Sequence, residues 1–408
     1  MSDLRDALPR PPEILVISHL FPTKKNLAMG NFVDQLCLAL ARDRKARPIV
    51  LSIVPTRMPL NPISGLKLLV KGFILARSET GISPNGVPVI VGESPYIPGF
   101  GIFNSFIHAC VLLRIHQRIA GSLRTDIVHA HTHLYDGFAA CLLSRRIRKP
   151  LIVTEHTGPF SSITNTWPKR RLVAAVAGHA SRVVTVSESL RSTMLKLMPH
   201  LKPMMVVLPN ALNTDIFKFQ GELARDQPKR VGWLGHFDPV KRIDKLVVLF
   251  GALRAEDPTL KLRIIGPDKG RAGVELDLWR RDLHDAAEYA SPETQREVAH
   301  ELAKLNLLLV TSDVETFSMA ALEGAASGVP VVSTDCGGPR DILFDAAIGR
   351  IGSSDAELIE HARAFLANDT GEARRLRSER VHGRFAADKT AARYLALYRE
   401  VMTEFTSP

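Results

Sequence analysis

Two glutamates, Glu315 and Glu323, offer the most informative chemistry in this chain of 408 residues. They lie in the segment LLLVTSDVETFSMAALEGAASGVPVVSTDCGGPRD, which runs from Leu307 to Asp341. An apolar strand is predicted to end at Thr311. A helix should follow from near Phe317 to about Ser327, because a glycine and a proline come directly after it. We therefore expect Glu315 just outside the helix and Glu323 about a turn and a half inside it.

The start of that helix suits an anionic ligand. The N–H groups near Phe317, Ser318 and Met319 lack partners inside the helix, and the helix dipole favours negative charge there, so they could hold a diphosphate. The two carboxylates could then accept hydrogen bonds from sugar hydroxyls. The alternative is that Glu315 only caps the helix and Glu323 is solvated. Against this, Glu323 lies among alanine, leucine and glycine, where an unpaired carboxylate is costly to bury.

Short apolar runs alternate with amphipathic stretches along both halves of the chain. This alternation is typical of a parallel sheet covered by helices on both faces. In the first half we predict strands over 13–18, 49–54, 126–131, 151–154 and 182–186. In the second half we predict strands over 231–234, 262–265, 307–311 and 331–333.

The fold class is therefore α/β, with two Rossmann-like, doubly wound parallel-sheet domains. We predict a first domain over 1–208, a second domain over 209–388, and a C-terminal helix over 389–408 that packs back on the first domain. A chain this long is expected to form two cores. Ligands of open α/β sheets bind at the carboxyl ends of the strands, so we expect a cleft where the two sheets face each other.

Composition narrows the class of protein. Four scattered cysteines predict no zinc site or redox pair. No apolar run is long enough for a membrane span, and the polar N-terminus lacks the core of a signal peptide, so a cytoplasmic protein is expected. The net charge is +11, and it is unevenly placed: +15 up to Asn210 and −4 beyond it. This asymmetry predicts an acidic partner for the first half, such as an anionic membrane surface, a phosphorylated acceptor or nucleic acid, or else a solvated basic surface.

The ordered set of motifs resembles the retaining GT-B glycosyltransferases of family 4, of the bacterial polysaccharide-assembly type. The segment with the two glutamates is similar to the donor-site signature of that family. The other resembling segments, in chain order, are MGNFVDQLCLALA, LIVTEHTG, TVSESLR, VVLPNALNTDIF, VGWLGHFDPVKRID and LRIIGPD. The resemblance covers nearly the whole chain, and the ordered set is more specific than any one motif.

The resemblance implies that the N-terminal domain over 1–208 is the acceptor side and that the domain over 209–388 binds the nucleotide-sugar donor. It also implies a role for each site residue. Lys241 would neutralise the diphosphate leaving group, and Gly30 would let the backbone approach the same phosphates. Glu315 would contact the donor sugar, Glu323 the ribose, and His156 would lie near the reacting carbon. The glycine turn that holds Gly266 would lie beside the nucleotide base.

Three positions depart from the pattern of that family. An arginine usually follows the glycine of the first strand of the donor domain, and here it is His236, which can change charge near neutral pH. The glycine after the linker asparagine is replaced by Ala211, and the glycine after the lysine by Arg242. These departures bear on the strength and pH range of donor binding.

Weaker signals leave alternatives open. His129, His131 and His133 alternate, so they could share a strand face and bind a metal, but the strand resembles a structural one and no metal-binding aspartate pair stands nearby, so no metal or cofactor is expected. His131, at the strand end, could contact the acceptor. The segment Leu66–Leu75 could be an interfacial helix on an anionic membrane or a core-facing helix. Basic clusters lack interleaved aromatics, so nucleic acid is not an expected partner.

The sequence thus predicts a metal-independent enzyme that moves a sugar from a nucleotide diphosphate sugar to a glycan or lipid-linked acceptor, in cell-surface polysaccharide assembly. Two other classes stay open: a nucleotide-sugar epimerase or phosphorylase on the same fold, and a non-catalytic nucleotide-sugar-binding module.

Overall fold

A computed structural model describes residues 10–22, 30–59, 77–221 and 227–406, together with positions 61, 63, 64, 67 and 70. The chain forms two compact units. Unit 1 comprises the residues up to Val186, Arg191–Ala211 and Asp388–Pro408, and unit 2 comprises Ser187–Leu190 and Leu212–Ala387. The expected interfacial helix over 66–75 falls almost wholly outside the described residues.

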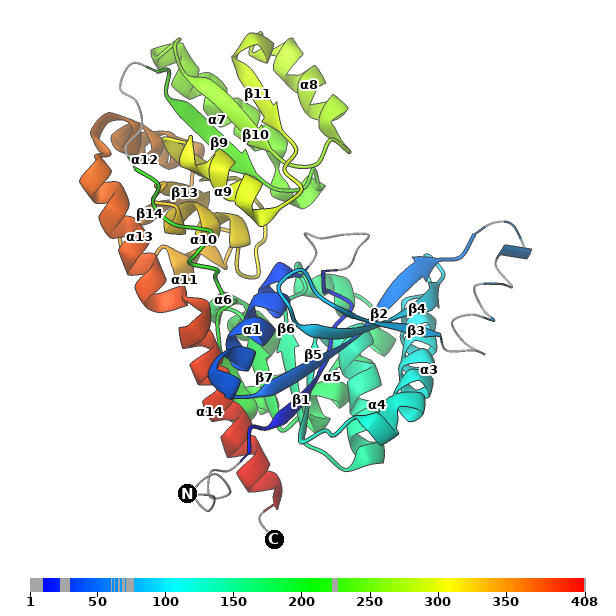
Figure 1. Ribbon diagram of the computed structural model, residues 1–408. Helices are drawn as coiled ribbons and strands as arrows, with labels where there is room; N and C mark the ends of the chain where they lie inside the picture. Colours follow the sequence, from blue (N-terminus) through cyan, green and yellow to red (C-terminus); the bar gives the residue numbers. More distant parts are fainter. Residues whose placement is uncertain are drawn as a thin grey trace, which may run out of the picture. The chain divides into compact units, whose positions relative to one another are not determined.

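Unit 1 is built on an eight-stranded sheet of order β3-β4-β2-β1-β5-β6-β7-β8 (Figure 1). All neighbours are parallel except β3 and β4. Every residue of β5 and β6 is buried, as expected for central strands of a parallel sheet covered on both faces, including the polar residues at their carboxyl ends. The strands are β1 (Glu13–Ile17), β2 (Arg47–Arg57), β3 (Ser78–Ile82), β4 (Pro88–Tyr96), β5 (Ile127–His131), β6 (Leu151–Glu155), β7 (Arg182–Thr185) and β8 (Met205–Val207).

Helices connect these strands and cover the sheet. The last of them, α14, comes from the C-terminal end of the chain yet belongs to unit 1, where Tyr394 and Tyr398 are buried on it. The helices are α1 (Asn31–Ala41), α3 (Gly101–Ile119), α4 (Phe138–Ile147), α5 (Trp167–His179), α6 (Glu188–Leu197) and α14 (Ala387–Thr406).

Unit 2 holds a six-stranded, fully parallel sheet of order β11-β10-β9-β12-β13-β14. Its core packs around Trp233 and Phe250. The strands are β9 (Arg230–Leu234), β10 (Lys261–Ile265), β11 (Ala287–Ala290), β12 (Leu307–Val310), β13 (Val331–Thr334) and β14 (Gly349–Gly352). The helices are α7 (Ile243–Glu256), α8 (Arg271–Arg280), α9 (Gln295–Ala303), α10 (Met319–Ala326), α11 (Pro339–Ile342), α12 (Asp355–Asn368) and α13 (Gly371–Phe385).

The predicted fold class, two α/β units with parallel sheets, is confirmed. One boundary was wrong: α10 begins at Met319 and not near Phe317. Ser318 has a left-handed backbone, with φ of 78°, so it is the N-cap and not part of the helix. Among the described residues, no helix is both long and apolar enough to cross a membrane.

Candidate active site

The order of strands in unit 2 places two of the predicted residues together. Strand connections reverse direction between β9 and β12, and open α/β sheets bind ligands at the carboxyl ends of the strands at such a point. Lys241 lies in the loop after β9, and Glu315 lies in the loop after β12. The two residues are 74 positions apart in the sequence, and the sheet brings them into contact.

Lys241 and Glu315 form an ion pair at this point. The Lys241 ammonium donates to Glu315 Oε1 at 2.7 Å, and the Ser312 hydroxyl donates to the same oxygen at 2.7 Å. The lysine side chain is 27% exposed and the glutamate side chain 11%, so the pair is accessible but partly shielded from water. A cation held in this way can stabilise negative charge that develops on a leaving diphosphate.

Backbone contacts fix the loop that carries Lys241. The Thr311 hydroxyl donates to the Lys241 carbonyl at 2.9 Å, and the Asp313 N–H donates to the Val240 carbonyl at 2.8 Å. These bonds tie the loop after β9 to the loop after β12. The position of Lys241 is therefore set by two strand ends and not by one flexible loop.

Arg242 explains one of the three departures from the resembling family. Its backbone is left-handed, with φ of 48° and ψ of 55°, a conformation that costs an L-residue about 1 kcal/mol and that glycine adopts freely. The Arg242 side chain compensates with ion pairs to Asp244 at 2.8 Å and Asp313 at 2.9 Å. The arginine therefore replaces glycine at a turn that the fold requires.

The residues at the start of α10 can offer a ligand their backbone N–H groups. The Phe317 side chain, however, packs within unit 2. The Phe317 ring is 2% exposed and packs edge-on against Phe385 with centroids 6.0 Å apart. The Ser318 hydroxyl accepts from the Ala321 N–H at 3.4 Å. A contact of Phe317 with a ligand would thus be made by its main chain.

Glu323 lies half-buried on α10, four residues into the helix after Met319. Burial raises the pKa of its carboxyl group to about 8. Within the described residues it has no hydrogen-bond partner that would stabilise the charged form. The carboxyl group is therefore largely neutral at pH 7 until a ligand supplies such a partner.

The backbone at positions 30 and 266 leaves no room for a side chain, so both positions require glycine. Gly30 has φ of 68°, and a Cβ there would overlap the Leu20 carbonyl. A Cβ on Gly266 would overlap the carbonyl oxygen of Gly235 at the ends of β9 and β10. His236 follows in the same loop and is exposed. The roles of these residues toward a nucleotide stay predictions.

In unit 1, His156 and His131 are in direct contact. His156 Nε2 lies 2.9 Å from His131 Nδ1, and the rings stack with centroids 5.1 Å apart. The Phe32 ring covers His156 with centroids 4.6 Å apart. Burial lowers the pKa of His156 to about 4 and holds the pKa of His131 well below its usual value, so both imidazoles are neutral at physiological pH. His131 is 1% exposed, and a direct contact with an acceptor stays a prediction.

The expectation that three alternating histidines share a strand face was wrong for His133. Strand β5 ends at His131, and His133 begins a π-helical turn. His129 instead bonds the Tyr398 hydroxyl at 2.8 Å and the Thr154 hydroxyl at 2.8 Å. These bonds engage both ring nitrogens of His129. Among the described residues, no cluster of three or more histidine, cysteine or carboxylate side chains is placed to hold a metal ion.

Sequence reasoning missed a second set of titratable residues at the carboxyl ends of β1, β5 and β6. His19 Nδ1 lies 2.7 Å from Asp136 Oδ2, and His108 Nε2 lies 3.4 Å from Asp136 Oδ1. His133 Nδ1 lies 2.6 Å from Glu155 Oε2. Burial opposes ionisation of both carboxyl groups, but their histidine partners outweigh it, and the pKa of each is lowered.

The position of this set could have been anticipated from the sheet order. In unit 1 the connections reverse between β1 and β5, so the residues after these strands lie at the topological switch point. His19 directly follows the run EILVIS, and Asp136 comes five residues after DIVHAH. The signal was a polar residue after each predicted strand end.

Comparison with known proteins agrees with this geometry. Residues 30–216 match the family described as Glycosyltransferase Family 4, and residues 215–380 match the family described as Glycosyl transferases group 1. The D-inositol 3-phosphate glycosyltransferase of Streptomyces bingchenggensis is 27% identical over 310 residues, which cover 68% of this chain and 67% of that protein.

Solved structures share the fold at low sequence identity. Sucrose-phosphate synthase of Thermosynechococcus elongatus has a TM-score of 0.75 at 19% identity, with 96% of this chain and 100% of that one covered. Anabaena HepE in complex with UDP-glucose has a TM-score of 0.67 at 15% identity, with 94% and 99% covered. The chain belongs to the family 4 glycosyltransferases and has the GT-B fold.

Proposed function

We propose that the protein is a retaining, metal-independent glycosyltransferase that acts in the cytoplasm, at the inner face of the cell membrane. It transfers a sugar from a nucleotide diphosphate sugar to a glycan or lipid-linked acceptor in cell-surface polysaccharide assembly. The observation that carries this proposal is the Lys241–Glu315 ion pair at the switch point of unit 2. HepE, which has the same fold, is named in complex with UDP-glucose, and this makes UDP-glucose the first donor to test.

In the proposed reaction, the bond between the anomeric carbon and the diphosphate oxygen breaks, and a bond to the acceptor oxygen forms on the same face. The acceptor proton goes to the departing phosphate, so no protein base is required. Lys241 stabilises the charge on that phosphate. Glu315 forms an ion pair with Lys241 and accepts hydrogen bonds from the donor sugar. Glu323 accepts hydrogen bonds from the ribose.

The first experiment is a thermal-shift screen with UDP-, GDP-, ADP- and dTDP-sugars, because a ligand of the native state raises the melting temperature. The donor that stabilises the protein is then incubated with three acceptors: a lipid-linked glycan, an oligosaccharide and D-inositol 3-phosphate, the last suggested by the named relative. We expect transfer that persists in EDTA, with the anomeric configuration retained.

The same experiment separates the alternatives. Donor binding with neither transfer nor hydrolysis would indicate a binding module. Conversion of the donor without any acceptor would favour an epimerase. Loss of activity in EDTA, restored by magnesium or manganese, would contradict metal independence.

A further inference from the structure

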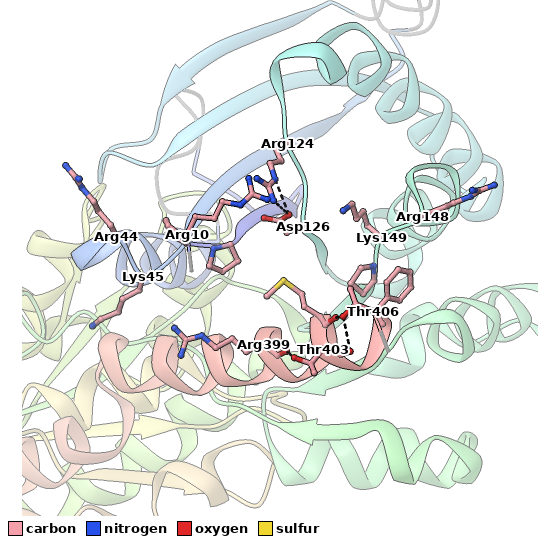
Figure 2. A pocket seen from close by; sticks show the side chains of 15 residues that line it. Arg10, Arg44, Lys45, Arg124, Asp126, Arg148, Lys149, Arg399, Thr403 and Thr406 are labelled. Atoms are coloured by element: carbon pink, nitrogen blue, oxygen red, sulfur yellow. Dashed lines mark hydrogen bonds and ion pairs between the residues drawn. The ribbon is translucent and has the colours of Figure 1, made fainter. Parts of the chain in front are cut away.

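Unit 1 contains a pocket of about 1100 Å³ beside α14, and neither His131 nor His156 lines it (Figure 2). Pro12, Asp126 and Pro150 line it, and each directly precedes β1, β5 or β6, so the pocket lies at the amino ends of these strands. A five-residue strand spans about 16 Å at ~3.3 Å per residue. The pocket is therefore separate from the site at the carboxyl ends.

The lining of this pocket is strongly basic. Seven of the fifteen lining residues are lysine or arginine, and one is an aspartate, which gives a formal charge of +6. The cations come from the segment before β1, the end of α1, the start of β5, the turn between α4 and β6, and α14, and Figure 2 shows them around the space beside α14. They are Arg10, Arg44, Lys45, Arg124, Arg148, Lys149 and Arg399.

Most of this charge is not neutralised within unit 1. Asp126, the sole carboxylate in the lining, is already bonded to Arg124 at 2.9 Å. In the part of the chain that the structure describes, Arg10, Arg44, Arg148, Lys149 and Arg399 have no carboxylate within ion-pair distance.

The cations of unit 2 behave differently. There Lys245, Arg263 and Arg340 each pair with an acidic side chain. Because unpaired cations gathered around one pocket repel one another and attract anions, the lining favours a ligand with several negative charges.

The pocket also has an apolar side. Met402 and Phe405 face it from α14, and Pro11, Pro12 and Pro150 lie at the strand ends. The Phe405 side chain is 50% exposed, which is unfavourable unless a ligand or surface covers part of it. The volume is at the upper end of the range for small-molecule sites, about 300–1,000 Å³, so a lone phosphate ion would leave most of it to water.

We propose that this pocket binds the phosphate or diphosphate group of an organic ligand at a second site, distinct from the donor site. Arginine forks bind phosphate oxygens at two points, and the apolar wall takes the carbon part of the ligand. The shared chemistry is a phosphate ester, supplied either by a soluble molecule or by a lipid headgroup. The proposal does not rest on the function proposed above.

The test with a soluble probe is calorimetric titration of the full chain with inorganic pyrophosphate. It is done in a Lys241→Gln background, which removes the proposed diphosphate contact in unit 2. Lys149→Gln with Arg399→Gln removes two pocket cations, and Lys196→Gln with Arg393→Gln is the matched control, because both control residues are exposed, belong to unit 1 and lie outside the pocket.

We expect the pocket pair to weaken pyrophosphate binding at least about tenfold, since a hydrogen bond to a charged group contributes roughly 1.5–3 kcal/mol. The control pair should leave the affinity within about twofold. Melting curves of all variants establish that each is folded. Equal weakening of pyrophosphate binding by both pairs of substitutions would mean a general surface-charge effect and would overturn the proposed phosphate site.

A vesicle arm identifies the source of the phosphate. The same variants are floated with phosphatidylcholine vesicles that contain or lack phosphatidic acid. Binding to phosphatidic acid that the pocket pair abolishes and the control pair does not, with no pyrophosphate binding, assigns a lipid headgroup. Pyrophosphate binding alone, lost only in the pocket pair, assigns a soluble phosphate. If neither probe depends on Lys149 and Arg399, the proposal is wrong.

Discussion

The carboxyl ends of the two sheets carry opposite kinds of chemistry. In unit 2, Lys241 and Glu315 form an ion pair at 2.7 Å and remain partly exposed. In unit 1, His131 and His156 contact each other under the Phe32 ring, and burial keeps both neutral. The same edge of the fold thus offers an accessible lysine–glutamate ion pair in unit 2 and, in unit 1, a neutral histidine pair beside the buried carboxyl groups of Asp136 and Glu155. The comparison suggests that the accessible cation for a leaving diphosphate is supplied by unit 2.

The largest expected effect is from Lys241→Gln, which removes the fixed charge of unit 2. Loss of one preorganised group that stabilises transition-state charge typically lowers kcat by about 10²–10³. Lys245→Gln is the matched control, because Lys245 also forms an ion pair at 2.8 Å, with Asp355. Steady-state kinetics with the donor found in the screen measures both. Comparable losses in the two variants would remove Lys241 from its special role.

The next effect tests the neutral side of the comparison. The pKa of His156, about 4, lies below the ordinary value of 6.5, so the unfolded state binds more protons between these values and stability falls as the pH drops from 6.5 to 4. The slope is set by the difference in bound protons between the unfolded and folded states, and His156→Asn should reduce that difference by close to one. It should also lower kcat about tenfold or more, with no change in the shape of the activity profile above pH 6.

Urea unfolding at intervals between pH 4 and pH 7 measures the slope. A His156→Asn variant with the wild-type pH dependence of stability would mean that the imidazole is charged in the native state. The contrast between the two units would then fail.

Glu323 is an exception within unit 2, because it is a carboxyl group that burial makes neutral. If the donor ribose donates hydrogen bonds to its charged form, binding must ionise a group with a pKa of about 8. Donor affinity should then rise with pH up to about 8, by at most tenfold per pH unit. Glu323→Gln should flatten this rise and weaken binding at pH 8.5. Calorimetric titrations at pH 6, 7 and 8.5 test it, and a rise that persists in the variant would assign it to another group.

The smallest effect is expected from His236→Arg, at the exposed end of the loop after β9. Arginine stays charged and binds phosphate at two points, so it should tighten donor binding a few-fold at pH 8 and change it little at pH 6. An unchanged affinity at both pH values would show that His236 points away from the donor and that Lys241 carries the charge by itself.

Much of the fold could be predicted from the sequence, because buried parallel strands are read from unbroken apolar runs. The strands around Val16, Val153 and Leu309 follow this rule. Strands β3 and β11 could not be predicted in this way. Every residue of β3 is exposed and β11 is only half-buried, so neither has an apolar run to indicate it.

The site was predictable only in part. Glu315 precedes α10 and Glu323 lies on it. Their spacing along the sequence is therefore enough to predict that the two glutamates lie near the same helix end. The Lys241–Glu315 contact joins residues 74 positions apart, and only strand order creates it. The contact of His129 with Tyr398 spans 269 positions and depends on a helix from the far end of the chain. No local pattern encodes either pair.

The return of α14 to unit 1 makes unit 2 an insertion between two pieces of another domain. During synthesis the segment 212–387 precedes α14, so unit 2 can begin to fold while unit 1 still lacks this helix. Until Tyr398 is in place, His129 lacks its Nδ1 partner from that helix. The environment of His129 is therefore completed only after the whole of unit 2 has been synthesised.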